Sequence, residues 1–176
     1  MPAMIRELPD ENATLALGAA LAAILRPGDI VALDGPLGAG KTTLVRAVAR
    51  SLGVDARLVS SPTFVFVNQY PIPAASPNSS LAAGQLVHID AYRLTSREDL
   101  DSLGWDRLFD SETGTIAGRA AAMLEWPSKI AGAMADEALA LVEIEPTGEY
   151  SRRVRLVLPH EWSTRGLDAL TGWGAS

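Results

Sequence analysis

An apolar run followed directly by a glycine-rich loop limits the folds that this chain can adopt. Hydrophobic side chains occupy consecutive positions in Ile30–Leu33, as in a parallel strand that is covered on both faces. The next segment, Gly35–Thr42, reads GPLGAGKT and matches the pattern G-x-x-x-x-G-K-[ST] without a mismatch. A helical pattern with Leu44 and Val48 on one face follows. The order strand, loop, helix predicts an α/β fold built around a phosphate-binding loop.

The chemistry of this loop follows from its residue types. Glycines allow the chain to wrap tightly, so that several backbone N–H groups converge on a phosphate. The helix that begins at the loop adds positive potential at its N-terminus. We expect Lys41 to reach the β- and γ-phosphates and the Thr42 hydroxyl to bind Mg²⁺. The sequence therefore predicts a site for a nucleoside triphosphate and magnesium.

Composition narrows the class of protein. A chain of 176 residues, 48% of them hydrophobic, suggests a single domain over residues 1–176 with a full core. The sequence has no cysteine, which excludes disulfide partners, thiol nucleophiles and Cys-ligated zinc. We see no apolar run long enough to span a membrane and no secretory signal in Met1–Asp10, so a cytoplasmic protein is expected. The net charge of −6 makes direct RNA binding unfavourable without a basic partner.

The periodicity of the remaining chain predicts a three-layer αβα fold with a mixed, partly parallel sheet. Helices are expected from Glu11 to Leu25, from Lys41 to Leu52, and from Ser96 to Leu103. The segments expected to form further strands are Thr63–Tyr70, Leu86–Asp90, Ala120–Glu125, Leu139–Ile144 and Val154–Leu158. The last two strands are expected to pair antiparallel. We expect residues 71–85 to form a long, exposed and flexible loop, and assign no role to the tail 159–176.

Two carboxylates follow apolar runs that resemble buried strands. Asp90 follows Leu86–Ile89, and Glu125 follows Ala121–Leu124. Because ligands of such sheets bind outside the carboxyl ends of the strands, either carboxylate is placed to serve the metal. One would hold Mg²⁺ and the other would orient or deprotonate the attacking water; the sequence leaves open which does which.

Two further residues near these motifs carry weaker signals. Thr63, in Ser61-Pro62-Thr63-Phe64, occupies the place of a switch segment that meets the γ-phosphate, but the spacing alone favours a simple Ser-Pro turn. His88 alternates with Asp90 on the expected strand. Since no second histidine is spaced to complete a ligand set, we interpret His88 as a structural hydrogen-bonding residue.

The four motifs together resemble the TsaE family. They are Leu37–Thr43, Ser61–Phe64, His88–Leu94 (HIDAYRL) and Glu125–Pro127 (EWP), in the family's order and spacing. The resemblance covers nearly the whole chain, from Leu8 to the region of Arg155. It implies a bacterial P-loop ATPase that hydrolyses ATP weakly alone and acts with TsaB and TsaD in threonylcarbamoyladenosine modification of tRNA. It also implies contact with tRNA only through that complex.

The resemblance further implies roles for individual residues. Lys41, Asp90 and Thr63 are the expected catalytic residues, while Thr42, Glu125 and Asp90 are the expected metal ligands. Trp126 is expected beside the site, Glu11 near the base or sugar, and Arg152 near the phosphates. The residues expected to bind ATP are Glu11, Gly35, Leu37, Gly38, Ala39, Gly40, Lys41, Thr42, Thr43, Trp126 and Arg152. The loop 71–84 is longer than the family leads us to expect, which would alter contacts with partners.

Other functions that use the same loop remain as alternatives. A small-molecule kinase needs an arginine-rich lid, whereas Arg93 and Arg97 flank only a short expected helix. A GTPase is disfavoured because Asp101–Gly104 fits D-x-x-G within a polar stretch and no N-K-x-D motif occurs. A non-catalytic module, in which ATP only fixes a conformation, is not separated from an ATPase by the sequence.

Overall fold

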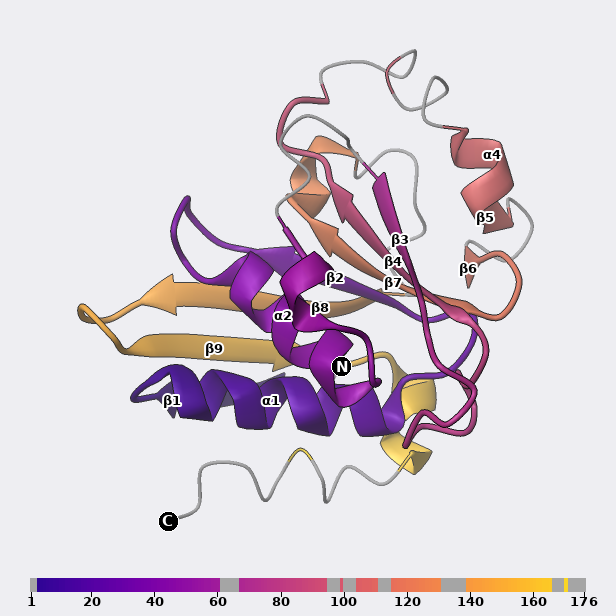
Figure 1. Ribbon diagram of the computed structural model, residues 1–176. Coiled ribbons are helices and arrows are strands. Elements are labelled where there is room, and N and C mark those ends of the chain that lie inside the picture. Colours follow the sequence, from indigo (N-terminus) through magenta and orange to yellow (C-terminus); the bar gives the residue numbers. More distant parts are fainter. Residues whose placement is uncertain are drawn as a thin grey trace.

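A seven-stranded mixed sheet forms the centre of the computed structural model (Figure 1). The structure describes residues 3–60, 67–94, 99, 104–110, 115–130, 139–165 and 170. The strand order is β1-β9-β8-β2-β7-β4-β3. The strands are β1 (Ala3–Leu8), β2 (Ile30–Asp34), β3 (Val67–Pro71), β4 (Gln85–Asp90), β7 (Ala120–Glu125), β8 (Leu139–Pro146) and β9 (Arg152–Val157).

The centre of the sheet is parallel and both edges are antiparallel. Strand β2 pairs in parallel with β7 and β8, and β4 pairs in parallel with β7. The antiparallel pairs are β1 with β9, β8 with β9, and β3 with β4. The expected mixed sheet is therefore confirmed. Because β2, β4 and β7 point the same way, their carboxyl ends meet at one edge, where the phosphate-binding loop also begins.

Two helices cover one face of the sheet, as Figure 1 shows. Helix α1 (Glu11–Ile24) begins at Asp10, whose side chain accepts a 2.9 Å hydrogen bond from the N–H of Ala13. Helix α2 (Lys41–Ser51) ends before Gly53, which has a φ of +87°. The helices pack closely, since a Cβ on Gly18 would lie 2.3 Å from the Cβ of Ala47. The bounds of both helices match the sequence-based prediction to within one residue.

Among the described residues, short elements cover the opposite face of the sheet. They are α4 (Trp105–Leu108), the hairpin of β5 (Phe109–Asp110) with β6 (Thr115–Ile116), and the 3-10 helix η2 (Pro127–Lys129). A second apolar cluster, which includes Leu94, Ile116 and Ile130, packs on Ile89 and Leu124 of the sheet. The helix expected over 96–103 lies outside the described residues except for position 99, which is helical.

Three regions differ from the sequence-based expectations. Strand β1 was not predicted, because five of its six residues are not buried and its place in the sheet depends on pairing with β9. Strand β3 is described from Val67 onward, while residues 63–66 lie outside the description. The interpretation of segment 71–84 as an exposed loop is wrong at Ile72, Asn78 and Leu81, which are buried.

Asn78 explains why segment 71–84 is packed. Its side-chain amide donates 2.8 Å hydrogen bonds to the carbonyl oxygens of Ala22 and Leu25. These are C-terminal carbonyls of α1, which the helix itself leaves without partners. The side-chain oxygen of Asn78 accepts from the N–H of Ser80 at 2.9 Å, which holds the turn. The segment therefore acts as a cap on α1.

After β9 the chain forms a short 3-10 helix, η5 (His160–Thr164). Nη1 of Arg165 lies 2.5 Å from Oδ2 of Asp29, the residue that precedes β2. The guanidinium of Arg165 also lies 4.7 Å from the centre of the buried Trp162 ring. Burial raises the pKa of Asp29 above its usual value, and Arg165 opposes that shift.

A further short 3-10 helix, η1 (Ala56–Leu58), follows α2. In the described part of the chain, no helix is long and apolar enough to cross a membrane.

Candidate functional site

The glycine-rich loop joins the end of β2 to the start of α2. Gly35, Gly38 and Gly40 all have positive φ angles, of +147°, +76° and +106°, which other residues rarely adopt. At Gly35 space is also limiting, because a Cβ would lie 2.3 Å from the carbonyl oxygen of Ile144 on β8. At Gly38 and Gly40 a Cβ would meet nothing within 4 Å. The loop is therefore fixed against β8 on one side and open on the other.

The first turn of α2 presents unpaired hydrogen-bond donors. The N–H of Leu44 donates to the carbonyl oxygen of Gly40 at 3.0 Å, which is the first hydrogen bond of the helix. The backbone N–H groups of Lys41, Thr42 and Thr43 donate to no described residue. These donors lie at the positive end of the helix dipole. The loop and the helix start together form a site suited to an anion.

Lys41 folds back onto its own loop. Its Nζ donates to the carbonyl oxygens of Gly35 at 2.6 Å and Pro36 at 3.0 Å, and it lies 3.8 Å from the centre of the Trp126 ring. Burial lowers the pKa of Lys41, while Glu125, Asp34 and Asp90 oppose that shift through their negative charges. The ammonium is thus held at the loop by carbonyls and an aromatic face, and reaches phosphate only when it leaves these contacts.

Glu125 connects the loop helix to the neighbouring strands. It is 3% exposed at the end of β7, and its Oε1 accepts hydrogen bonds from Thr42 Oγ1 at 2.8 Å and His88 Nε2 at 2.9 Å. Asp90, buried at the end of β4, stands opposite Glu125 in the strand register. The structure therefore brings together four residues that were predicted as a site from distant parts of the sequence, namely Lys41, Thr42, Asp90 and Glu125.

The side-chain oxygens and backbone N–H groups of this site suit Mg²⁺ bound to a phosphate. A hydroxyl and two carboxylates supply the oxygen ligands that Mg²⁺ prefers, and the three unpaired N–H groups suit phosphate oxygens. Among the described residues, no three His, Cys, Asp or Glu side chains are grouped as a metal cage. Mg²⁺ commonly takes one or two carboxylates, waters and substrate phosphates, so such a cage is not needed.

A cleft of about 320 Å³, here called the phosphate-side cleft, is lined by residues 37–43, Asp90, Tyr92, Arg93, Glu125 and Trp126. Aromatic residues stand at its edge. Trp126 adopts a left-handed backbone conformation with a φ of +60°, which is uncommon outside glycine. Its ring centre lies 5.0 Å from that of Tyr92. Leu37, at the tip of the loop, is 83% exposed and lines the same cleft. The sequence had placed Trp126 beside the site but gave Tyr92 no role.

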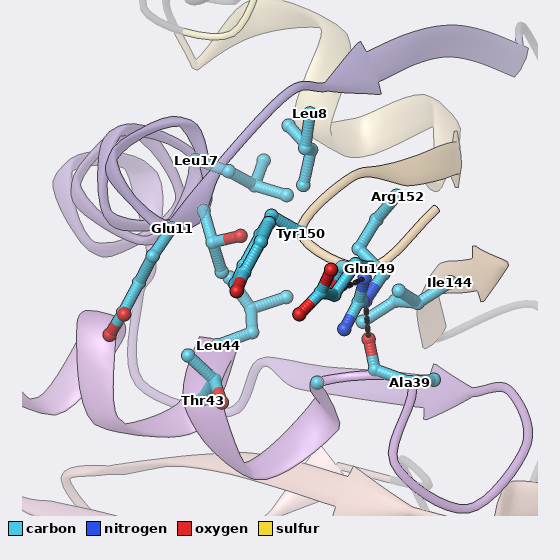
Figure 2. Close-up of a pocket in the computed structure, with 12 residues that line it drawn as sticks. Leu8, Glu11, Leu17, Ala39, Thr43, Leu44, Ile144, Glu149, Tyr150 and Arg152 are labelled. Atoms are coloured by element: carbon cyan, nitrogen blue, oxygen red, sulfur yellow. Dashed lines mark hydrogen bonds between the residues drawn. The ribbon is translucent and has the colours of Figure 1, made fainter. Parts of the chain in front are cut away.

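A second cleft of about 200 Å³ lies on the other side of the loop (Figure 2). Figure 2 shows Tyr150 in its middle, between Glu11 of α1 and Arg152 of β9. Arg152 donates from Nε to the carbonyl oxygen of Ala39 at 2.9 Å, so here it braces the loop. The predicted residues Ala39, Gly40 and Thr43 line this cleft too.

Sequence reasoning missed two residues of the second cleft, Glu149 and Tyr150. Both lie in the turn between β8 and β9, where no motif marks them, and Tyr150 is 72% exposed. The signal that was available is an aromatic residue in a Gly-containing turn, two positions before the strand that begins at Arg152. Thr63, expected to act as a switch, lies outside the described residues.

Comparison with known proteins identifies one family to which this sequence is similar. The family model "Threonylcarbamoyl adenosine biosynthesis protein TsaE" matches residues 8–154. A Streptomyces coelicolor protein, named tRNA threonylcarbamoyladenosine biosynthesis protein TsaE, is 34% identical over 89% of this chain and 98% of its own length. Proteins of the same name from Bacillus subtilis and Aquifex aeolicus are 33% and 31% identical, over 83% and 85% of this chain and 78% and 92% of their own lengths.

A solved structure shares the fold. The crystal structure of Bacillus subtilis YdiB superposes with a TM-score of 0.66 at 20% identity and covers 97% of this chain and 95% of its own. This likeness supports the α/β fold of the phosphate-loop type. The family model that matches residues 8–154, and relatives more than 30% identical over most of this chain, show that this chain belongs to the TsaE family, which takes part in the biosynthesis of threonylcarbamoyladenosine in tRNA.

Proposed function

We propose that this protein binds ATP with Mg²⁺ and hydrolyses it to ADP and phosphate in support of tRNA threonylcarbamoyladenosine modification, together with TsaB and TsaD. The observation that carries the proposal is the 2.8 Å hydrogen bond from Thr42 to Glu125. It joins the first turn of α2 to a carboxylate from a separate strand. This is the combination of hydroxyl and acid that a phosphate-bound Mg²⁺ requires.

Each side chain has a distinct part in this proposal. The N–H groups of residues 41–43 bind phosphate oxygens, and Lys41 exchanges its two loop carbonyls for the β- and γ-phosphates. Thr42 and Glu125 hold Mg²⁺, which when bound neutralises charge on the phosphates. Asp90, on the neighbouring strand, orients the attacking water and accepts its proton while the bond from the γ-phosphorus to the bridging oxygen breaks.

The second cleft supplies the place for the base and sugar. It begins at Ala39, Gly40 and Thr43, so it is continuous with the loop that would hold the phosphates. Glu11 and Arg152 contribute polar groups, and Tyr150 contributes an aromatic face. A purine nucleotide would therefore lie across the start of α2, with its phosphates on the Glu125 side and its base on the Tyr150 side.

The charge of the protein supports an indirect contact with tRNA. The net charge of −6 opposes binding to a phosphate backbone, so contact with tRNA is expected through partner subunits. The first test measures phosphate release from ATP by the protein alone and with purified TsaB and TsaD. We expect slow hydrolysis alone and faster hydrolysis with both partners, and equal rates would remove the coupling.

A variant separates hydrolysis from binding alone. Asp90→Ala removes the proposed water-orienting group, so hydrolysis and tRNA modification should both be lost while ATP still binds. If modification continues in this variant without hydrolysis, the protein is a nucleotide-dependent binding module instead. Formation of a phosphorylated small molecule in place of free phosphate would identify a kinase.

A further inference from the structure

We infer that His88 is a positioning residue, whose Nε2–H fixes Oε1 of Glu125 and thereby directs Oε2 of the same carboxylate toward the proposed metal. The inference rests on the proposed binding of Mg²⁺ and ATP. From the sequence, His88 was expected only to form a structural hydrogen bond. The inference gives His88 a part in positioning a metal ligand.

The geometry assigns different surroundings to the two oxygens of Glu125. Oε1 accepts two hydrogen bonds, from His88 at 2.9 Å and from Thr42 at 2.8 Å. No described residue donates a hydrogen bond to Oε2. Glu125 also lines the phosphate-side cleft that contains residues 37–43. One oxygen is therefore fixed by protein donors, and the other is left for a cation or its bound water.

The position of His88 restricts what its ring can do. His88 is fully buried on β4, two residues before Asp90, and faces the same side of the sheet. An ionised carboxylate only accepts hydrogen bonds, so in this contact the proton is assigned to Nε2. The ring cannot swing away into solvent, because its side chain has no exposed surface. Nε2 is thus a rigid donor aimed at Glu125.

The other nitrogen of His88 argues against a purely structural role. Nδ1 is buried and has no hydrogen-bond partner among the described residues. A buried polar atom without a partner lowers stability, so this site would be better packed by an apolar side chain if stability alone mattered. The histidine is therefore explained by what Nε2 does for Glu125. Such outer partners orient metal ligands in general, and their loss typically lowers metal affinity about 10- to 100-fold.

The test compares two substitutions at one position. His88→Gln keeps an N–H donor at the same number of bonds from the backbone, whereas His88→Leu removes it. Binding of a non-hydrolysable ATP analogue is measured by calorimetry across a MgCl₂ titration and again in EDTA. We expect His88→Leu to raise the Mg²⁺ concentration for half-maximal binding about tenfold, and His88→Gln to stay close to wild type. Binding in EDTA should be unchanged in both.

Two controls make the outcome decisive. In a Glu125→Ala background, His88→Leu should have no further effect on the Mg²⁺ titration, because the group that it positions is absent. His88→Asn, whose amide is too short to reach Glu125, gives a second test and should behave like His88→Leu. Thermal unfolding identifies which variants fold.

Three results would overturn the role of His88. They are a wild-type Mg²⁺ titration in folded His88→Leu or His88→Asn, a loss in His88→Gln as large as in His88→Leu, and an equal loss of binding in EDTA. Failure of the proposed function looks different, because wild-type protein would then show no Mg²⁺-dependent binding of the analogue at all.

Discussion

The two sides of the phosphate-binding loop are built in different ways. On the Glu125 side, the half-buried Thr42 of α2 and the buried His88 of β4 both donate to Glu125 of β7, in hydrogen bonds of 2.8 and 2.9 Å. On the Tyr150 side, the cleft is closed by a turn between two antiparallel strands, and Tyr150 is 72% exposed. Rigid strands fix the groups that would meet phosphate and metal. The groups that would meet the base lie on a turn, where positions are less constrained.

This contrast leads to different expectations for variants on each side. Substitutions on the Glu125 side should act strongly and through Mg²⁺ or the phosphates. Substitutions on the Tyr150 side should act weakly and independently of Mg²⁺.

The largest effect is expected for Lys41→Ala. The variant removes the cation that would contact two phosphates, and hydrogen bonds to charged groups contribute about 1.5–3 kcal/mol, so ATP affinity should fall by roughly 100-fold. Calorimetry with ATP and Mg²⁺ measures the change. Since Lys41 contacts loop carbonyls rather than the apolar core, the variant should stay folded by circular dichroism. An unchanged affinity would show that Lys41 does not meet the phosphates.

Glu125→Ala should have the next largest effect, through the metal. Loss of a carboxylate ligand should raise the Mg²⁺ requirement for ATP binding by roughly tenfold or more, while binding in EDTA changes little. Glu143→Ala is a matched control, because it removes a half-buried carboxylate of β8 that forms an ion pair with Arg155. An identical Mg²⁺ titration for wild type and Glu125→Ala would exclude Glu125 from the metal site.

Tyr150→Ala should have a modest effect that does not depend on Mg²⁺. Stacking of a base on an aromatic side chain contributes about 1–3 kcal/mol, and the exposure of Tyr150 favours the low end, so ATP affinity should fall roughly fivefold. The loss should be equal in Mg²⁺ and in EDTA, and Tyr150→Phe should restore affinity. A loss confined to Mg²⁺ would remove the distinction between the two sides.

The smallest expected effect is on how the free energy of unfolding of the nucleotide-free protein changes with pH. Burial lowers the pKa of Lys41 in the folded state below its usual value of 10.5. Between the lowered pKa and 10.5 the unfolded chain binds more protons, so the free energy of unfolding should rise with pH in that range. Urea denaturation from pH 7 upward should show a smaller rise for Lys41→Met than for wild type. Equal slopes would show that burial does not perturb Lys41.

The sequence predicted one side of the loop far better than the other. Lys41, Thr42, Asp90 and Glu125 follow apolar strand patterns or a defined motif, and parallel pairing brings such strand ends together. The positions of Glu149 and Tyr150 in the second cleft depend on how a surface turn folds against α1, which periodicity does not encode. The tertiary partners of Asn78 were equally hidden, because composition marks a polar segment as a loop without showing that its amide caps α1.

The edges of the sheet illustrate the same limit. Strand β1 has a weak strand pattern with charged residues, and it forms because β9 supplies its hydrogen bonds.

The expectation for His88 was correct in kind, since it is a hydrogen-bonding residue, but the sequence did not show that its partner is Glu125. Strand register, rather than local pattern, places these two side chains together.

A crystal structure with a non-hydrolysable ATP analogue and Mn²⁺ in place of Mg²⁺ tests the central claim most directly. Anomalous scattering locates the manganese without reference to the protein. We predict one ion beside Thr42 Oγ1 on the Oε2 side of Glu125, with the phosphates on the N–H groups of residues 41–43. An ion bound elsewhere, or a nucleotide whose phosphates lie away from the loop, would contradict the account.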